Sequence, residues 1–127
     1  MEIRRMERKN FTSMKGIELE MLHPWPALNA PFTGAWVVVP AGSASYPHSH
    51  HQGELFIGIS GSAAIVVDGE HREFAAGDLV HLLPNCHHTV INDGEQDFHY
   101  YAIWWDTDAC EGFVTRHRAA AAQNEVS

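Results

Sequence analysis

The chain has 127 residues, of which 45% are hydrophobic, with 4 Trp, 6 Phe and 3 Tyr; its size favours one domain with a real core, and its composition excludes intrinsic disorder. The formal net charge is −8 with only 8 Lys plus Arg, and this acidic balance argues against a nucleic-acid partner. No apolar run approaches the roughly 20 residues that span a bilayer, and the N-terminus has no apolar signal segment. Cys86 and Cys110 are expected to be free thiols. These three features together predict a cytoplasmic protein without a membrane partner.

The first 34 residues predict an irregular arm. Three prolines, Pro24, Pro26 and Pro31, suppress both helix and central strand in this part of the sequence. The arm either wraps around the domain or reaches across to a second copy of the chain.

Short runs of β-branched and aromatic residues follow, separated by glycine, proline and aspartate turn signals. They predict strands at residues 36–39, 46–50, 54–59, 63–67, 72–74, 79–83, 88–92 and 98–105. Asp68-Gly69 and Asp93-Gly94 are typical of β-hairpin turns, because glycine tolerates a positive φ. Many short strands with frequent turns predict an all-β sandwich or small barrel, here spanning residues 35–106.

A helix is predicted at the C-terminal end, over residues 108–122. Asp108 is its expected N-cap, and Glu111, three residues later, is the expected second member of a capping box. No linker is long enough to separate a second domain, so residues 1–127 are expected to form a single domain.

Three side chains with metal-ligand chemistry share one face of the predicted β region. His48 and His50 are two residues apart, so both imidazoles face the same way on an extended chain, and Glu54 has the same parity. Two imidazoles and a carboxylate form a ligand set of borderline hardness that suits a divalent transition metal. His87 and His88 lie further along the chain, and strand alternation lets only one of them join the site.

The same residues resemble the two sequence motifs of the cupin family. The positions of the first motif are filled by Gly42, His48, His50, Glu54 and Gly61. The positions of the second motif are filled by Gly77, Asp78, His88 and Asn92. Two positions depart from the second motif, because Leu83 stands where proline is usual and Asn85 stands where glycine is usual.

This resemblance implies a double-stranded β-helix, a jelly-roll barrel of two antiparallel sheets with a metal in its mouth. The ligands that it implies are His48, His50, Glu54 and His88. Their chemistry suits Zn, Fe, Mn or Ni and does not suit Ca or Mg, which prefer oxygen shells. Four protein ligands around an octahedral ion leave two positions for water, dioxygen or a substrate.

Tyr46 and Tyr100 are the candidate catalytic residues, since a tyrosine hydroxyl near a metal can act as acid, base or substrate anchor. Aromatic walls are expected around the metal; the candidates are Trp36, Phe56, Trp104 and either Phe98 with Tyr100 or His99 with Tyr101. Cys86 is expected to be a structural thiol rather than a nucleophile. The roles of His81, His87 and His99 stay open.

These features favour a metal-dependent enzyme that acts on a small molecule, of dioxygenase, isomerase or lyase type, for example in natural-product metabolism. The aromatic strand and the helix after it also loosely resemble the cupin portion of hydrazine synthetases, in which a zinc cupin forms an N–N bond beside a synthetase-like partner. A non-enzymatic sensor or ligand carrier is the alternative from another class. A homodimer is expected, because cupins are commonly dimers and because Leu55, Ile57 and Ile59 predict an apolar face opposite Glu54.

Overall fold

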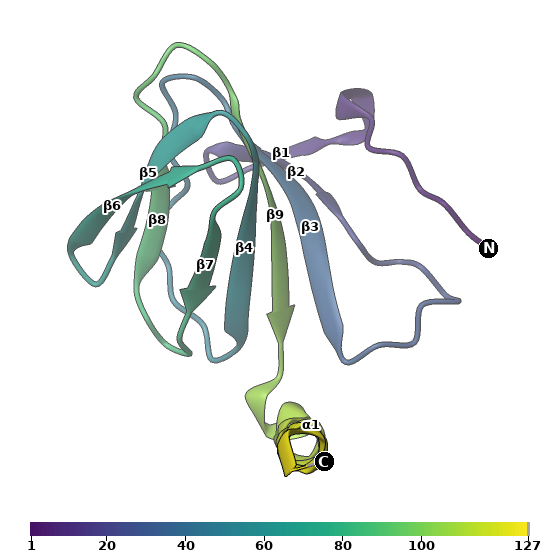
Figure 1. Ribbon diagram of the computed structural model, residues 1–127. Coiled ribbons are helices and arrows are strands. Elements are labelled where there is room, and N and C mark those ends of the chain that lie inside the picture. Colours follow the sequence, from purple (N-terminus) through teal and green to yellow (C-terminus); the bar gives the residue numbers. More distant parts are fainter. Residues whose placement is uncertain (127) are drawn as a thin grey trace.

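Two antiparallel sheets face each other and enclose the core (Figure 1). The computed structural model describes residues 1–126, with side chains through residue 123. The larger sheet has the order β1-β2-β3-β9-β4-β7, with β1 at Thr12–Met14, β2 at Ile17–Met21, β3 at Phe32–Val39, β9 at Phe98–Trp105, β4 at Gly53–Ser60 and β7 at Leu79–Leu82. The smaller sheet has the order β6-β5-β8, with β5 at Ser62–Val67, β6 at Glu70–Ala75 and β8 at His88–Ile91. The predicted all-β fold is confirmed.

Aromatic rings from both sheets form the centre of the core. Strand alternation turns Phe98 and Tyr100 of β9 inward, where both are buried. Phe74 of β6 meets them from the other sheet, with ring centroids 4.8 Å from Phe98 and 5.6 Å from Tyr100. Burial of these rings supplies much of the apolar contact that holds the two sheets together.

The same alternation places His99 and Tyr101 on the outer face of the larger sheet. Tyr101 packs there edge-on against Trp36, with ring centroids 4.8 Å apart. Of the two sets left open for β9, the set with Phe98 and Tyr100 therefore lines the interior. The expectation that Trp36 lines the cavity is wrong, because its position on β3 has the opposite parity from Ala35 and Val37, which do line it.

One of the two predicted hairpins forms and the other does not. Asp68 and Gly69 adopt φ of 48° and 86° and join β5 to β6 as predicted. Asp93-Gly94 does not close a hairpin, because β8 pairs with β5 in the smaller sheet while β9 pairs with β3 and β4 in the larger one. The chain crosses here from one sheet to the other.

Asn92 stabilises the segment that crosses between the sheets, and the residue is only 1% exposed. Its amide nitrogen donates to Val39 O at 3.0 Å and to Gln96 O at 2.7 Å, and its oxygen accepts from the Gly94 N–H at 3.0 Å. These bonds tie β3 to the β8–β9 loop, which gives the asparagine of the second motif a structural role.

We expect Asn92→Ala to lower the free energy of unfolding by about 3 kcal/mol, because one buried and two partly buried backbone groups lose their partner. Urea denaturation followed by tryptophan fluorescence measures this change. Asp93→Ala, in the exposed part of the same loop, is the matched control and should leave the midpoint nearly unchanged. Equal midpoints for the two variants would contradict this role.

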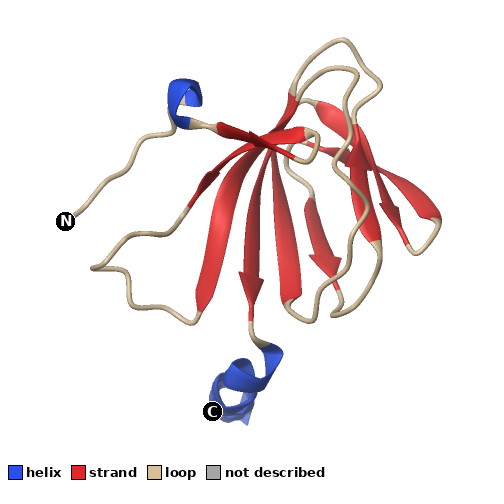
Figure 2. Cartoon of the chain, turned by 180° about the vertical axis from the view of Figure 1, so that it is seen from behind, coloured by secondary structure: helices blue, strands red, loops and turns tan. Residues whose placement is uncertain are grey.

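The N-terminal region is more regular than the predicted arm of residues 1–34. A short 3-10 turn, η1 at Arg8–Asn10, leads into the β1–β2 hairpin, and β2 pairs with β3 (Figure 2). Residues 1–7 and the proline-rich stretch of residues 22–31 are irregular, as predicted. The arm assignment is therefore wrong for residues 12–21, where Ile17, Leu19 and Met21 alternate with glutamates as a strand requires.

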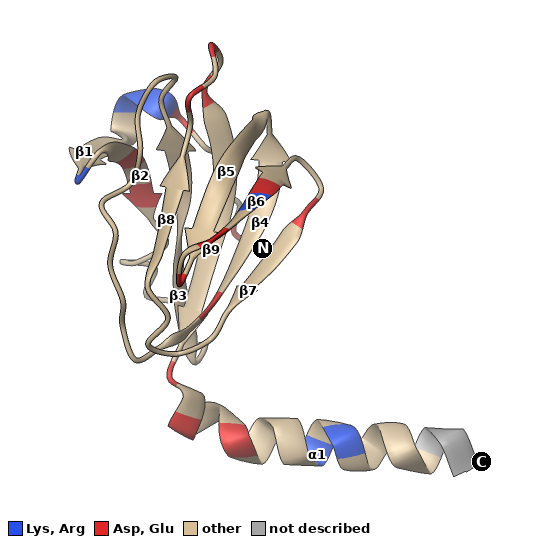
Figure 3. Cartoon of the chain, turned by 90° about the vertical axis from the view of Figure 1, so that its left-hand side faces the viewer, with Lys and Arg blue, Asp and Glu red and all other residues tan. Residues whose placement is uncertain are grey.

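The C-terminal helix, α1 at Thr107–Val126, projects away from the two sheets (Figure 3). It begins earlier and ends later than predicted, and its N-cap is Asp106, whose Oδ1 accepts the Asp108 N–H at 2.9 Å. The predicted cap at Asp108 is wrong, because that residue already lies within the first turn. Among the described residues, no helix has both the length and the apolar character needed to cross a membrane.

Candidate metal centre

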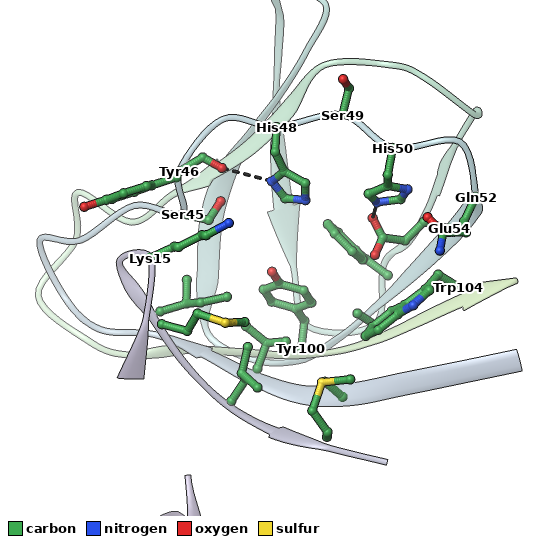
Figure 4. A pocket seen from close by; sticks show the side chains of 18 residues that line it. Lys15, Ser45, Tyr46, His48, Ser49, His50, Gln52, Glu54, Tyr100 and Trp104 are labelled. Atoms are coloured by element: carbon green, nitrogen blue, oxygen red, sulfur yellow. Dashed lines mark hydrogen bonds and ion pairs between the residues drawn. The ribbon is translucent and has the colours of Figure 1, made fainter. Parts of the chain in front are cut away.

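Four side chains from three parts of the chain converge inside the open end of the barrel. His48 and His50 lie on the segment between β3 and β4, Glu54 lies near the start of β4, and His88 opens β8. One ring nitrogen from each histidine lies within 4.8 Å of the others. Glu54 Oε1 is 3.2 Å from Nε2 of both His50 and His88. The structure thus brings together all four residues of the predicted ligand set, of which Figure 4 shows His48, His50 and Glu54.

Backbone hydrogen bonds fix the segment that carries the first two histidines. Residues 46–50 do not form the predicted regular strand, but the His88 N–H donates to His48 O at 2.9 Å and the His48 N–H donates to His88 O at 3.2 Å. The Asn85 N–H donates to His50 O at 2.7 Å from a residue with φ of 67°. An extended segment held to β8 preserves the parity on which the prediction rests.

Carbonyl groups set the tautomers of two of the histidines. His48 Nδ1 lies 3.0 Å from Tyr46 O, and His88 Nδ1 lies 3.3 Å from Cys86 O. Because a carbonyl oxygen only accepts hydrogen bonds, each Nδ1 carries the proton and donates it. The lone pair of each ring is then on Nε2, which is the arrangement that metal-binding histidines adopt.

The surroundings of His88 Nε2 indicate whether these residues can hold a metal ion. His88 is 2% exposed, and its Nε2 has no hydrogen-bond partner among the described residues, as is also true of His50 Nδ1. The neighbour of His88 Nε2 is the buried carboxylate of Glu54 at 3.2 Å. A lone pair that faces a carboxylate away from water is unfavourable unless a positive charge lies between them. Three imidazoles and one carboxylate are also a donor set that suits divalent transition metals, so the residues fit such an ion.

The remaining histidines lie outside this cluster. His87 is exposed, and its backbone N–H donates to Asp68 Oδ1 at 2.8 Å, whereas His88 is buried and is the member of the pair that joins the cluster. His81 stacks on Trp105 on the outer face, with ring planes 5° apart. His99 also lies on the outer face of β9, opposite the core.

A cavity of about 470 Å³ opens in front of the cluster. Its inner wall is formed by β3, β4 and β9, with Phe56, Tyr100 and Trp104 as the aromatic members. The β1–β2 hairpin extends this wall beyond β3 in the same sheet and contributes Met14, Lys15, Ile17, Leu19 and Met21. These hairpin residues were missed in the sequence analysis, although the Lys15-Gly16 turn followed by alternating apolar residues could have revealed them.

The two candidate tyrosines occupy different positions. Tyr100 lies buried at the base of the cavity and its hydroxyl points toward His48 (Figure 4). Burial, and to a lesser extent the charge of Glu54, raises the pKa of Tyr100 well above its usual value, so the phenol stays protonated and is a donor rather than a base. Tyr46 is 61% exposed at the rim, and its hydroxyl points away from the histidines.

Cys86 has the structural environment expected for it. Its side chain is buried, and burial together with the charges of Asp68 and Glu54 raises the pKa of the thiol. A thiol that remains protonated is a weak nucleophile. Its backbone carbonyl is the group that orients His88.

The sequence and the fold were compared with those of known proteins. The family model described as Cupin domain matches residues 35–104. A Cupin 2 conserved barrel domain protein from Salinispora arenicola is 44% identical, with a TM-score of 0.81 over 92% of this chain and 98% of that one. The plu4264 protein from Photorhabdus luminescens is 39% identical, with a TM-score of 0.80 over 91% of this chain and 97% of that one.

An uncharacterised protein from Methanocaldococcus jannaschii is 29% identical over 76 residues, which is 59% of this chain and 61% of that protein. The match therefore spans less than two thirds of that relative. Together, the family match and the two similar structures confirm the predicted jelly-roll barrel. None of these matches shows the narrower resemblance to hydrazine synthetases.

Proposed function

The chain belongs to the cupin family, and we propose that it is a metal-dependent enzyme acting on a small molecule. The metal would be a divalent transition ion held by His48, His50, Glu54 and His88. The observation that carries the proposal is His88 Nε2, which is buried, has no hydrogen-bond partner in the described part of the chain, and faces the carboxylate of Glu54 across 3.2 Å.

The surrounding residues support chemistry on a bound ligand. A metal in this position would supply Lewis-acid activation or, if it is iron or manganese, activation of dioxygen. The ligand residues are held by β4, β8 and the segment bonded to β8, and such rigid placement is what a preorganised catalytic site needs. The protonated hydroxyl of Tyr100 can donate a hydrogen bond to a ligand oxygen in the cavity.

We expect protein purified from cells to contain close to one divalent transition metal ion per chain, and a chelator to lower the melting temperature. An ion present at 100 times its Kd stabilises the folded state by about 2.7 kcal/mol, and chelation removes this contribution. Elemental analysis and thermal unfolding measure the two effects. A chain purified without metal that neither gains metal on incubation with Zn, Fe, Mn or Ni nor changes its melting temperature would refute the metal site.

The enzymatic part of the proposal needs a separate test, because a ligand carrier of the same fold would also bind metal. Metal-loaded protein is incubated with a small-molecule extract, and mass spectrometry follows which compounds change. An enzyme converts a compound in amounts far above its own concentration, and Glu54→Gln should slow that conversion strongly. A compound that is retained one to one and released unchanged would indicate the carrier function instead.

The reaction type, the identity of the metal, a cytoplasmic location and the homodimer all remain predictions. Apolar side chains on the outer face of the larger sheet support self-association, since Ile59 and Leu79 are exposed there. A synthetase-like partner has no comparable support in the described residues.

A further inference from the structure

The cavity has the candidate metal ligands His48, His50 and Glu54 at one end and a cationic side chain, Lys15, at its mouth. Lys15 is the only lysine or arginine among the described residues that line the cavity, and its side chain points inward (Figure 4). It forms no ion pair with any described side chain, whereas Arg8, Lys9 and Arg72 each have a carboxylate partner. A free cation directed into a cavity of an acidic protein is an attractive site for an anion.

The backbone around Lys15 is fixed to the segment that carries the metal ligands. Lys15 has φ of 51° and Gly16 has φ of 86°, which forms the tight β1–β2 turn. A Cβ added at Gly16 would lie 2.0 Å from Ala44 O, so the turn packs directly against residue 44. The Tyr46 N–H also donates to Lys15 O at 3.1 Å, two residues before His48. The base of the lysine side chain is therefore held in register with the histidine cluster.

The wall between the two ends is apolar. The hairpin contributes Ile17, Leu19 and Met21, and β3 and β4 of the same sheet contribute Val37 and Phe56. A ligand that fills this space needs an apolar body. A single ammonium group matches one negative charge, while phosphate sites typically combine several backbone and side-chain donors.

We infer that the substrate is a small monocarboxylate with an apolar body, bound with its carboxylate at Lys15 and its other end toward the metal ligands. This inference rests on the proposed function, because it places the reacting end of the ligand at His48, His50, Glu54 and His88. Lys15 is then a specificity-determining residue of the cavity mouth.

The test compares a charged probe with its uncharged isostere. Binding of 3-phenylpropanoate and 3-phenylpropanamide to the metal-loaded full chain is measured by isothermal titration calorimetry at constant ionic strength. We expect the acid to bind about tenfold more tightly than the amide, as befits one partly solvated charge-assisted hydrogen bond. Lys15→Met, which keeps the length of the side chain, should abolish this preference. Lys9→Met, which removes a lysine that is paired with Glu7 outside the cavity, should retain it.

The outcomes separate the two proposals. Metal content is measured in every sample, and absence of metal in the wild-type chain refutes the proposed function independently of Lys15. With metal present, equal affinities for acid and amide, or no binding of either, overturns the inference. A preference for the acid that persists in Lys15→Met also overturns it, because the carboxylate would then be recognised by the metal end.

Discussion

Replacing His88 by alanine is expected to lower the affinity for the metal by at least about 100-fold. Loss of a side chain that only orients a metal ligand already lowers affinity by up to about 100-fold, so loss of a ligand itself should cost at least as much. His88 places a buried Nε2 at 3.2 Å from Glu54, and alanine offers no atom in its place. The remaining carboxylate and two imidazoles would leave the ion more weakly held. Equilibrium dialysis against a competing chelator measures the change, and any metal-dependent turnover should fall with occupancy.

His87→Ala is the matched control for this experiment. The two histidines are adjacent in sequence, but His87 is exposed and lies outside the cluster. The control removes the same side chain and should retain full metal content. Equal metal loss in both variants would show that the β7–β8 region, rather than the imidazole of His88, determines binding, and equal retention would remove His88 from the ligand set.

Replacing Phe74 by alanine is expected to lower the free energy of unfolding by about 3–5 kcal/mol, the usual range for a buried phenylalanine. Phe74 is 0% exposed and stacks with Phe56 at a centroid distance of 6.1 Å, in addition to its contacts with Phe98 and Tyr100. The cavity left by its ring lies between the two sheets, where neighbouring strands have little freedom to collapse. Denaturant unfolding gives the change directly.

Phe113→Ala provides the comparison, because Phe113 is 63% exposed on α1. Its loss should change the free energy of unfolding by no more than about 0.5 kcal/mol. A large effect at Phe113 would show that α1 packs against another surface in solution. A small effect at Phe74 would show that the aromatic cluster contributes less to stability than its burial implies.

The cluster of three histidines and Glu54 was the most predictable part of the molecule, because it depends on parity rather than on regular strand geometry. His48 and His50 converge although residues 46–50 form only one isolated bridge, between His48 and His88. Both ligands need only an extended backbone, and hydrogen bonds to β8 supply it. The choice of His88 over His87 also follows from alternation, since His88 and Val90 point to the same interior.

Pairing between distant strands was less predictable. Asp93-Gly94 has the local signature of a hairpin, yet the strands on either side belong to different sheets. Long-range pairing thus overrides the local turn signal. Similarly, nothing local distinguishes Trp36 on the outer face from Trp104 in the cavity, because both lie in strands rich in aromatic or β-branched residues.

Proline in residues 22–31 obscured the hairpin that precedes it. The three prolines correctly indicate an irregular stretch, but that stretch begins only after β2, and strands occupy residues 12–14 and 17–21 before it. The alternation of Ile17, Leu19 and Met21 with glutamates is a clear strand pattern over a short span. Its position beside β3 creates one wall of the cavity.

The β1–β2 hairpin lies wholly outside residues 35–104, over which the family model matches. The four residues that would hold an ion and the hairpin side of the cavity therefore come from separate stretches of the sequence. Randomising or transplanting residues 12–21 from a homologue would sample new selectivities while leaving the four ligand codons untouched. Because residues 12–21 are separate from the four candidate ligands, this segment is a suitable target for changing ligand selectivity by directed evolution.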